Sequence, residues 1–266
     1  MMVGFALADI IGKRDEITDD RYKINEGDYI TKYTIMTIAT MDWLMSDWHS
    51  SKRLNKMFYE SYINYPDKTD KVYGAGLHSW LEKGAQWYRT DYGASCAVWA
   101  SVAGHKATNM RELKRLVKRI TRCTHNTDTA LQSSEIVSIV IYLCKKGFKK
   151  NKIIEYLHKN YNYTMCDNVE KEVKEHQFTS NAKVVTFLAL DILFSSKQYS
   201  DACKLCGYLK ENKQLISCLT GIMAEAYFNT PLFNNLEQFK SIFPKKYYTT
   251  LKEFKKYKFS ANTNVK

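Results

Sequence analysis

The sequence DYITKYTIMTIATMDWLMS, residues 28–46, decides the fold of this 266-residue chain. From Ile35 to Met45 most side chains are apolar, and Thr37 and Thr40 form a thin polar stripe. A helix that is apolar around most of its circumference belongs inside a domain. The segment therefore predicts a buried helix at the centre of the molecule.

The expected start of this helix is Thr31-Lys32-Tyr33-Thr34, two hydroxyl residues that flank a cation and a phenol. The first turn of a helix has free N–H groups and the positive end of the helix dipole. It could therefore receive an anion or a sugar hydroxyl, and the alternative is plain helix capping.

The composition predicts an all-α protein with one large core. The chain is 45% hydrophobic and contains only 11 glycines and three prolines, and these prolines fall where periodic segments break. No linker or repeat divides it. We expect one orthogonal helical bundle over residues 1–257 and a frayed basic tail over residues 258–266.

The net charge of +12 is unevenly distributed, because residues 1–50 hold five Lys and Arg against nine Asp and Glu. The excess of positive charge therefore lies in residues 51–266. It would suit nucleic acid or a polyphosphate. The lysines are scattered rather than clustered, which favours a solvated surface.

The seven cysteines and the absence of a secretory leader predict a reduced, cytoplasmic compartment. Cys203 and Cys206 form a lone CxxC, so buried thiols on a helix are expected rather than a zinc site. No apolar run has the length of a membrane span, and residues 184–194, the longest, predict a buried helix.

Two further patterns indicate helix packing. Gly4, Ala8 and Gly12 recur every fourth residue, so one helix stripe allows close approach of another helix or a ligand. If that helix continues past Gly12, Glu16 lies on the same side as Asp9; the alternative is that the helix ends at Gly12.

Six motifs, in order, resemble the ADP-ribosylglycohydrolases, including the dinitrogenase-reductase-activating glycohydrolases. They are Gly4–Gly12 followed by Glu16, Thr31–Ala39, Tyr73-Gly-Ala-Gly with Trp80, Tyr92-Gly93, Thr124-His125-Asn126, and Leu219–Asn229. The resemblance spans about residues 3–257. It implies the family's all-α orthogonal bundle and a glycosidic bond of ADP-ribose as the family's substrate.

The resemblance fails at the residues that hold the family's two Mg²⁺ ions. Where the family has aspartates before the central helix, this chain has Lys32 and Tyr33, and the second motif falls on Asn212 and Gln214. Mg²⁺ needs anionic oxygen ligands, so we expect no metal and no other cofactor. Thr18-Asp19-Asp20 could be a displaced motif, but an exposed turn is the favoured interpretation.

The candidate ligand-binding residues are Thr31, Lys32, Tyr33, Thr34, Tyr92, Gly93, His125, Asn126, Asn212 and Gln214. Lys32 could pair with a diphosphate or carboxylate, and Tyr33 and Tyr92 could stack on a base. Alternatively Lys32 is solvated, and Tyr33 fills the vacated cleft. His125 is more typical of a structural histidine beside a cap than of a base.

Three functions follow from these observations. The favoured one is a pseudoenzyme that binds an ADP-ribose-type nucleotide, an ADP-ribosylated protein or a partner protein in the old cleft, without membrane association. The second is a divergent glycohydrolase that uses Glu16 as catalytic acid or base, with Asp128 or Asp28 as a further candidate, and works without the two metals. The third is a nucleic-acid-binding protein on the same fold.

Overall fold

The structure is a computed structural model, and it describes residues 3–14, 24–47, 49–86, 92–230 and 232–257. Helices are the only regular secondary structure in these residues. The predicted all-α class is confirmed. The elements are α1 (Gly4–Ile11), α2 (Lys32–Met45), α3 (Ser51–Asn64), α4 (Asp70–Tyr73), α5 (Ala75–Glu82), α6 (Cys96–Ala100), α7 (Val102–Lys106), α8 (Met110–Thr121), α9 (Asp128–Lys145), α10 (Lys150–Tyr161), α11 (Val169–Glu175), α12 (Ala182–Ser195), α13 (Tyr199–Gly207), α14 (Lys213–Tyr227), the 3₁₀ segment η1 (Leu232–Ser241) and α15 (Lys245–Lys256).

The apolar stretch around residues 28–46 forms α2, which contacts α1, α3, α6 and α15. Every residue from Tyr33 to Leu44 is buried except Asp42. Its threonines remain compatible with the core because Thr37 and Thr40 donate hydrogen bonds to the carbonyls one turn back, at Tyr33 and Met36. The prediction of a buried central helix is confirmed.

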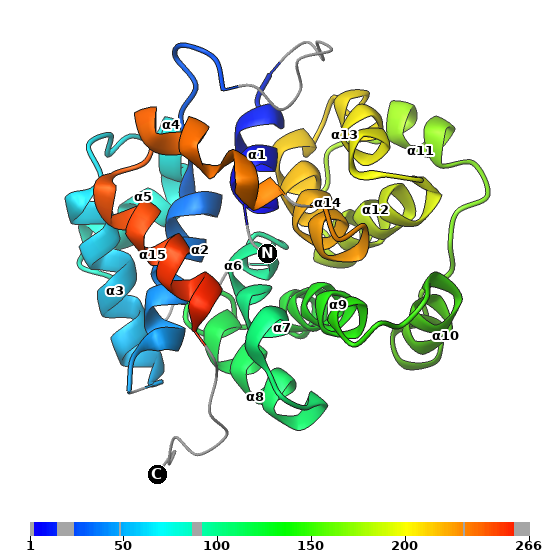
Figure 1. The fold of residues 1–266 in the computed structure, drawn as a ribbon, viewed down its shortest axis with the longest axis horizontal. Helices are drawn as coiled ribbons and strands as arrows, with labels where there is room; N and C mark the ends of the chain where they lie inside the picture. Colours follow the sequence, from blue (N-terminus) through cyan, green and yellow to red (C-terminus); the bar gives the residue numbers. More distant parts are fainter. Residues whose placement is uncertain (1–2, 15–23, 48, 87–91, 231, 258–266) are drawn as a thin grey trace.

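Helix α1 lies between α2 and the group α12–α14 (Figure 1). Its small-residue stripe faces α14, and a Cβ atom at Gly4 would lie 2.6 Å from the carbonyl oxygen of Gly221. A Cβ atom at Gly221 would lie 2.6 Å from the Cβ atom of Ala8. The predicted partner of the stripe is therefore another helix, and the contact fixes α14 beside α1.

Helix α9 lies below α14 in the view of Figure 1 and contacts α6, α7 and α8 as well as α12 and α14. Thr127 caps it by accepting a hydrogen bond from the backbone N–H of Ala130. The long Ile- and Val-rich segment that follows is helical because burial on several sides outweighs the modest helix propensity of these residues.

The sequence left the end of the first helix open, and the structure ends α1 at Ile11 with Gly12 as its C-cap. The segment 73–83 is broken at Gly74, whose φ of +73° ends α4 and begins α5. Cys203 and Cys206 are buried on α13 as expected, and all seven cysteines are free. In the described residues, no helix combines the length and apolar character that a membrane span requires.

Candidate functional site

The carboxylate of Asp9 is the centre of the polar cluster at the start of α2. Asp9 is fully buried in an otherwise apolar helix. Oδ2 accepts hydrogen bonds from the backbone N–H of Thr31 at 2.7 Å and of Thr34 at 3.3 Å. The hydroxyl of Thr31 donates to Oδ1 at 2.6 Å, and the hydroxyl of Thr34 donates to Oδ2 at 2.7 Å. The first turn of α2 therefore does receive an anion, a carboxylate of the same chain.

Gln214, in the first turn of α14, completes this cluster. Its Nε2 lies 2.7 Å from Oδ1 of Asp9 and 3.2 Å from the hydroxyl of Thr31. A fifth hydrogen bond to the carboxylate thus comes from an amide, and it ties α14 to the start of α2. Lys213 supports the same junction by donating to the carbonyl of Arg14 at 2.6 Å.

Asn212 lies beside this junction, but its side chain contacts a different part of the chain. Its φ is +51°, in the left-handed region that asparagine tolerates. Oδ1 accepts from the backbone N–H of Thr179 at 3.0 Å and lies 3.2 Å from Nε2 of His176, and Nδ2 donates to the Thr179 carbonyl. Its amide is therefore engaged with the connection between α11 and α12.

Lys32 points from α2 toward the start of α5. A Cβ atom at Gly74 would lie 3.2 Å from the Lys32 ammonium nitrogen. Here a polar pocket of about 240 Å³ opens, lined by Lys32, Gly74, Ala75, Gly76, Leu77, Ser95 and Trp99. Gly74 offers no side-chain cap to α5, and the first residues of α5 line the pocket together with the cation of Lys32.

His125 lies behind this pocket and holds its wall in place. It is buried, with Nε2 3.1 Å from the hydroxyl of Ser95 and Nδ1 2.8 Å from that of Thr124. Its ring meets Trp99 edge-on, with the centroids 5.8 Å apart. The indole N–H of Trp99 is buried and has no hydrogen-bond partner among the described residues. These contacts make His125 a support for two residues of the pocket lining.

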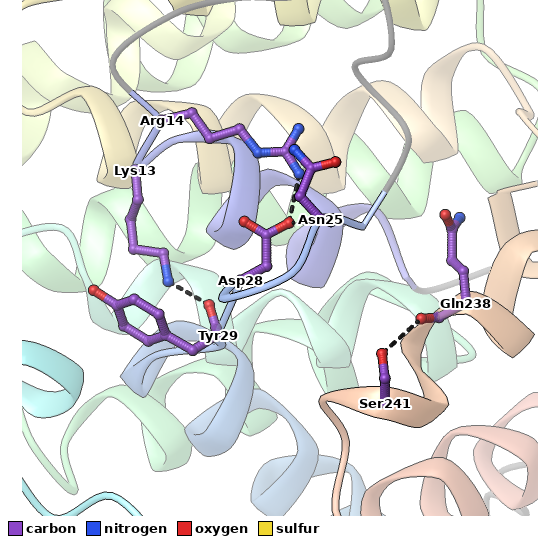
Figure 2. A network of polar contacts seen from close by, with 7 residues as sticks. All are labelled: Lys13, Arg14, Asn25, Asp28, Tyr29, Gln238 and Ser241. Carbon is purple, nitrogen blue, oxygen red and sulfur yellow. Dashed lines mark hydrogen bonds and ion pairs between the residues drawn. The ribbon is translucent and has the colours of Figure 1, made fainter.

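Figure 2 shows how the two ends of the α1–α2 connection are held together. Arg14 pairs with Asp28 at 2.6 Å, and Asp28 also accepts from the backbone N–H of Asn25. Lys13 donates to the carbonyl of Tyr29 and lies 3.0 Å from the centroid of its ring. Burial lowers the pKa of Lys13 to about 8, against the opposing attraction of nearby Asp9.

Several lysines lie in or beside the segments that form the Asp9 cluster. Lys71 lies 4.2 Å from the centroid of the same Tyr29 ring that Lys13 contacts. Lys32 follows Thr31, and Lys213 precedes Gln214. Among the residues that the structure describes, no three His, Cys, Asp or Glu side chains gather as a metal site would require. The described site is therefore rich in cations, with Asp9 as its buried acid.

The remaining candidates divide by exposure. Tyr33 is 7% exposed and packs in the core, so its ring presents no stacking face, whereas Tyr92 is 64% exposed. Asn126 is exposed, and Gly93 borders open space. Glu16, Thr18-Asp19-Asp20 and the tail 258–266 lie outside the described residues.

Asp9 is the residue that the list of candidates from the sequence missed. Its position in the sequence could have identified it, because a single acid in the apolar helix Gly4–Ile11 must find hydrogen-bond donors in the core. The sequence did not show which donors these were, since they come from α2 and α14.

The sequence matches the family model described as ADP-ribosylglycohydrolase over residues 1–222, and the chain belongs to this family. A solved structure described as an "ADP-ribosylglycohydrolase-related protein complex" is similar to this fold, with a TM-score of 0.68 over 96% of this chain and 95% of that one. The two sequences are 14% identical, so this likeness shows the fold alone. A comparison with curated protein sequences finds no match.

Proposed function

We propose that this family member is a pseudoenzyme that binds an ADP-ribose-type ligand, free or attached to a protein, beside the start of α2. The family acts on ADP-ribose-type substrates. The observation that carries the proposal is the pocket in which the Lys32 ammonium faces the uncapped start of α5. An ammonium and a helix N-terminus together favour a phosphate group.

The same residues argue that the ligand binds without the family's two Mg²⁺ ions. The resemblance places Lys32, Tyr33, Asn212 and Gln214 where the family has metal-binding aspartates, and none of these side chains is an anion. Asp9 is an acid near this place, and both of its oxygens already accept hydrogen bonds. Because Mg²⁺ dehydrates reluctantly and is usually held through carboxylates, this donor set does not fit two such ions.

The size of the pocket limits which part of the ligand it could hold. At about 240 Å³ it is smaller than the pockets that enclose a drug-sized molecule. It would hold one phosphate or the diphosphate. The exposed ring of Tyr92, three residues before Ser95, is the candidate to stack on the base.

The test is a thermal-shift series with ADP-ribose, with Mg²⁺ and with EDTA. A ligand at about 100 times its Kd stabilises the folded state by about 2.7 kcal/mol. We expect the same upward shift of Tm with and without Mg²⁺. Lys32→Met should weaken binding about tenfold, the value of one charge-assisted contact. Lys52→Met, which removes an exposed lysine of α3, should leave binding unchanged.

Three outcomes would contradict the proposal. The first is the absence of any shift with ADP-ribose. The second is turnover of an ADP-ribosylated protein, which would indicate an enzyme; loss of that turnover in Glu16→Gln would favour the divergent glycohydrolase. The third is tight oligonucleotide binding with a steep salt dependence, which would favour the nucleic-acid function.

A further inference from the structure

A second, larger cavity lies at the opposite end of α14 from the Asp9 cluster. Its volume is about 540 Å³, within the range of small-molecule sites. Gln214 and Tyr227 mark the two ends, and 13 residues of helix separate them by about 20 Å. The cavity is lined by His105, Lys106, Cys144, Lys145, Gly147, Glu225, Ala226, Tyr227, Asn229, Leu251, Phe254 and Lys255. It is therefore separate from the site described above.

Two lysines bring positive charge to this cavity without a carboxylate partner. Lys106 donates to the carbonyls of Phe254 and Tyr257, and Lys145 donates to the carbonyl of His105. Among the described residues, neither forms an ion pair. An ammonium has three N–H groups. One therefore remains on Lys106 and two remain on Lys145.

Both lysines are partly desolvated at their ammonium ends. Burial, followed by the nearby charge of Lys145, lowers the pKa of Lys106 to about 8. Burial likewise lowers the pKa of Lys145. The two lysine side chains extend to carbonyl groups at the ends of helices, where cations are favourable. These hydrogen bonds to neutral carbonyls leave the positive charge of the two lysines without a compensating anion.

Glu225 lines the same cavity but does not neutralise these lysines. Its Oε2 accepts hydrogen bonds from the backbone N–H groups of Val3 at 3.0 Å and Gly4 at 2.8 Å. Burial raises the pKa of Glu225, which favours its neutral form. Its carboxyl group thus serves the start of α1.

Besides the two lysine ammonium groups, the cavity is lined by the imidazole of His105. His105 is 7% exposed, and its Nε2 has no hydrogen-bond partner among the described residues. Burial lowers the pKa of His105, so its ring is neutral, and Nε2 can donate in one tautomer. The cavity lining also includes apolar side chains, Leu251 and Phe254 of α15.

We propose that this cavity binds an organic anion of about mononucleotide size. Its carboxylate or phosphate group would accept hydrogen bonds from Lys106, Lys145 and His105. Its apolar body would pack against Leu251 and Phe254. The cavity would then hold a second ligand, whose binding is independent of Lys32.

The experiment uses two probes with one aromatic body and different acidic groups, phenyl phosphate and 3-phenylpropionate, and the neutral control 3-phenylpropanol. Isothermal titration of the full chain should show that at least one acid binds and that the alcohol does not. Lys145→Met should weaken this binding at least about tenfold. Lys32→Met should leave it unchanged, which separates this site from the ADP-ribose site.

A second measurement needs no variant. Reductive methylation of the wild-type protein, mapped by mass spectrometry, should modify Lys106 and Lys145 less in the presence of the bound acid, with Lys32 unaffected. Binding of neither acid would overturn the proposal. So would equal affinity in Lys145→Met, or protection of Lys32 in place of the cavity lysines.

Discussion

Replacing Asp9 by asparagine tests whether its carboxylate holds the start of α2 to α1 and α14. The substitution keeps the size of the side chain, removes its charge and turns one acceptor oxygen into an NH₂ group. At Oδ2 that group would face the backbone N–H groups of Thr31 and Thr34, which cannot reverse. At Oδ1 it would face the Thr31 hydroxyl and the Gln214 amide, both of which can turn. The second orientation is therefore the less costly.

The cost in this orientation follows from the contacts. Gln214 would turn its Oε1 toward the new NH₂ group and lose its hydrogen bond to the Thr31 hydroxyl. The three contacts at Oδ2 would persist without the charge, and a hydrogen bond to a charged group exceeds a neutral one by about 1 kcal/mol. The favourable interaction with the α2 dipole, about 0.5–1 kcal/mol, would also be lost. Together with the lost hydrogen bond, these losses lead us to expect that Asp9→Asn lowers the free energy of unfolding by about 4–5 kcal/mol.

Urea unfolding followed by tryptophan fluorescence measures this change, with Trp43 and Trp99 as buried reporters. A loss of this size corresponds to a fall in Tm of about 8–20 °C for a domain of this length. Asp167→Asn, at an exposed position, is the matched control and should change the free energy by less than about 0.5 kcal/mol. A loss below about 1 kcal/mol for Asp9→Asn would refute the reasoning.

Three further predictions concern the neighbouring contacts. Gln214→Glu places a second carboxylate beside Asp9 and should lower the free energy of unfolding at neutral pH by about 2–4 kcal/mol. Since the added acid has a raised pKa in the folded state, urea titrations should show recovery at about pH 4.5. Gly221→Ala should cost about 2–3 kcal/mol in urea unfolding through overpacking, whereas Gly93→Ala, in open space, should cost little. Lys106→Met removes a cation whose pKa falls from 10.5 to about 8 on folding, so wild-type stability should rise relative to the variant between these pH values. The group is half exposed, which limits this rise to about 1 kcal/mol.

The fold was largely predictable because its signals are local. The apolar circumference of residues 35–45 predicted the buried α2. The spacing of Gly4, Ala8 and Gly12 predicted the close approach of a helix or a ligand, and the structure shows that a helix approaches. The break between α4 and α5 at Gly74 was harder to predict, since a positive φ at one residue does not change the spacing of apolar residues.

The site was predictable only in part because its contacts are not local. The sequence identified Thr31, Thr34 and Gln214 from motifs, and the structure brings all three to Asp9. It also grouped Asn212 with Gln214, two residues apart. At the start of a helix that separation turns the two side chains apart, and Asn212 contacts Thr179 instead.

The character of Gln214 links stability to the proposed loss of metals. An acid at this position would put a second carboxylate near Asp9, and two carboxylates at this distance need a cation or a shared proton between them. An amide of the same length donates to Asp9 directly and removes that need. A shorter or apolar side chain would leave Oδ1 one donor short. The amide therefore satisfies the buried acid from within the chain, as the proposed loss of the metals requires.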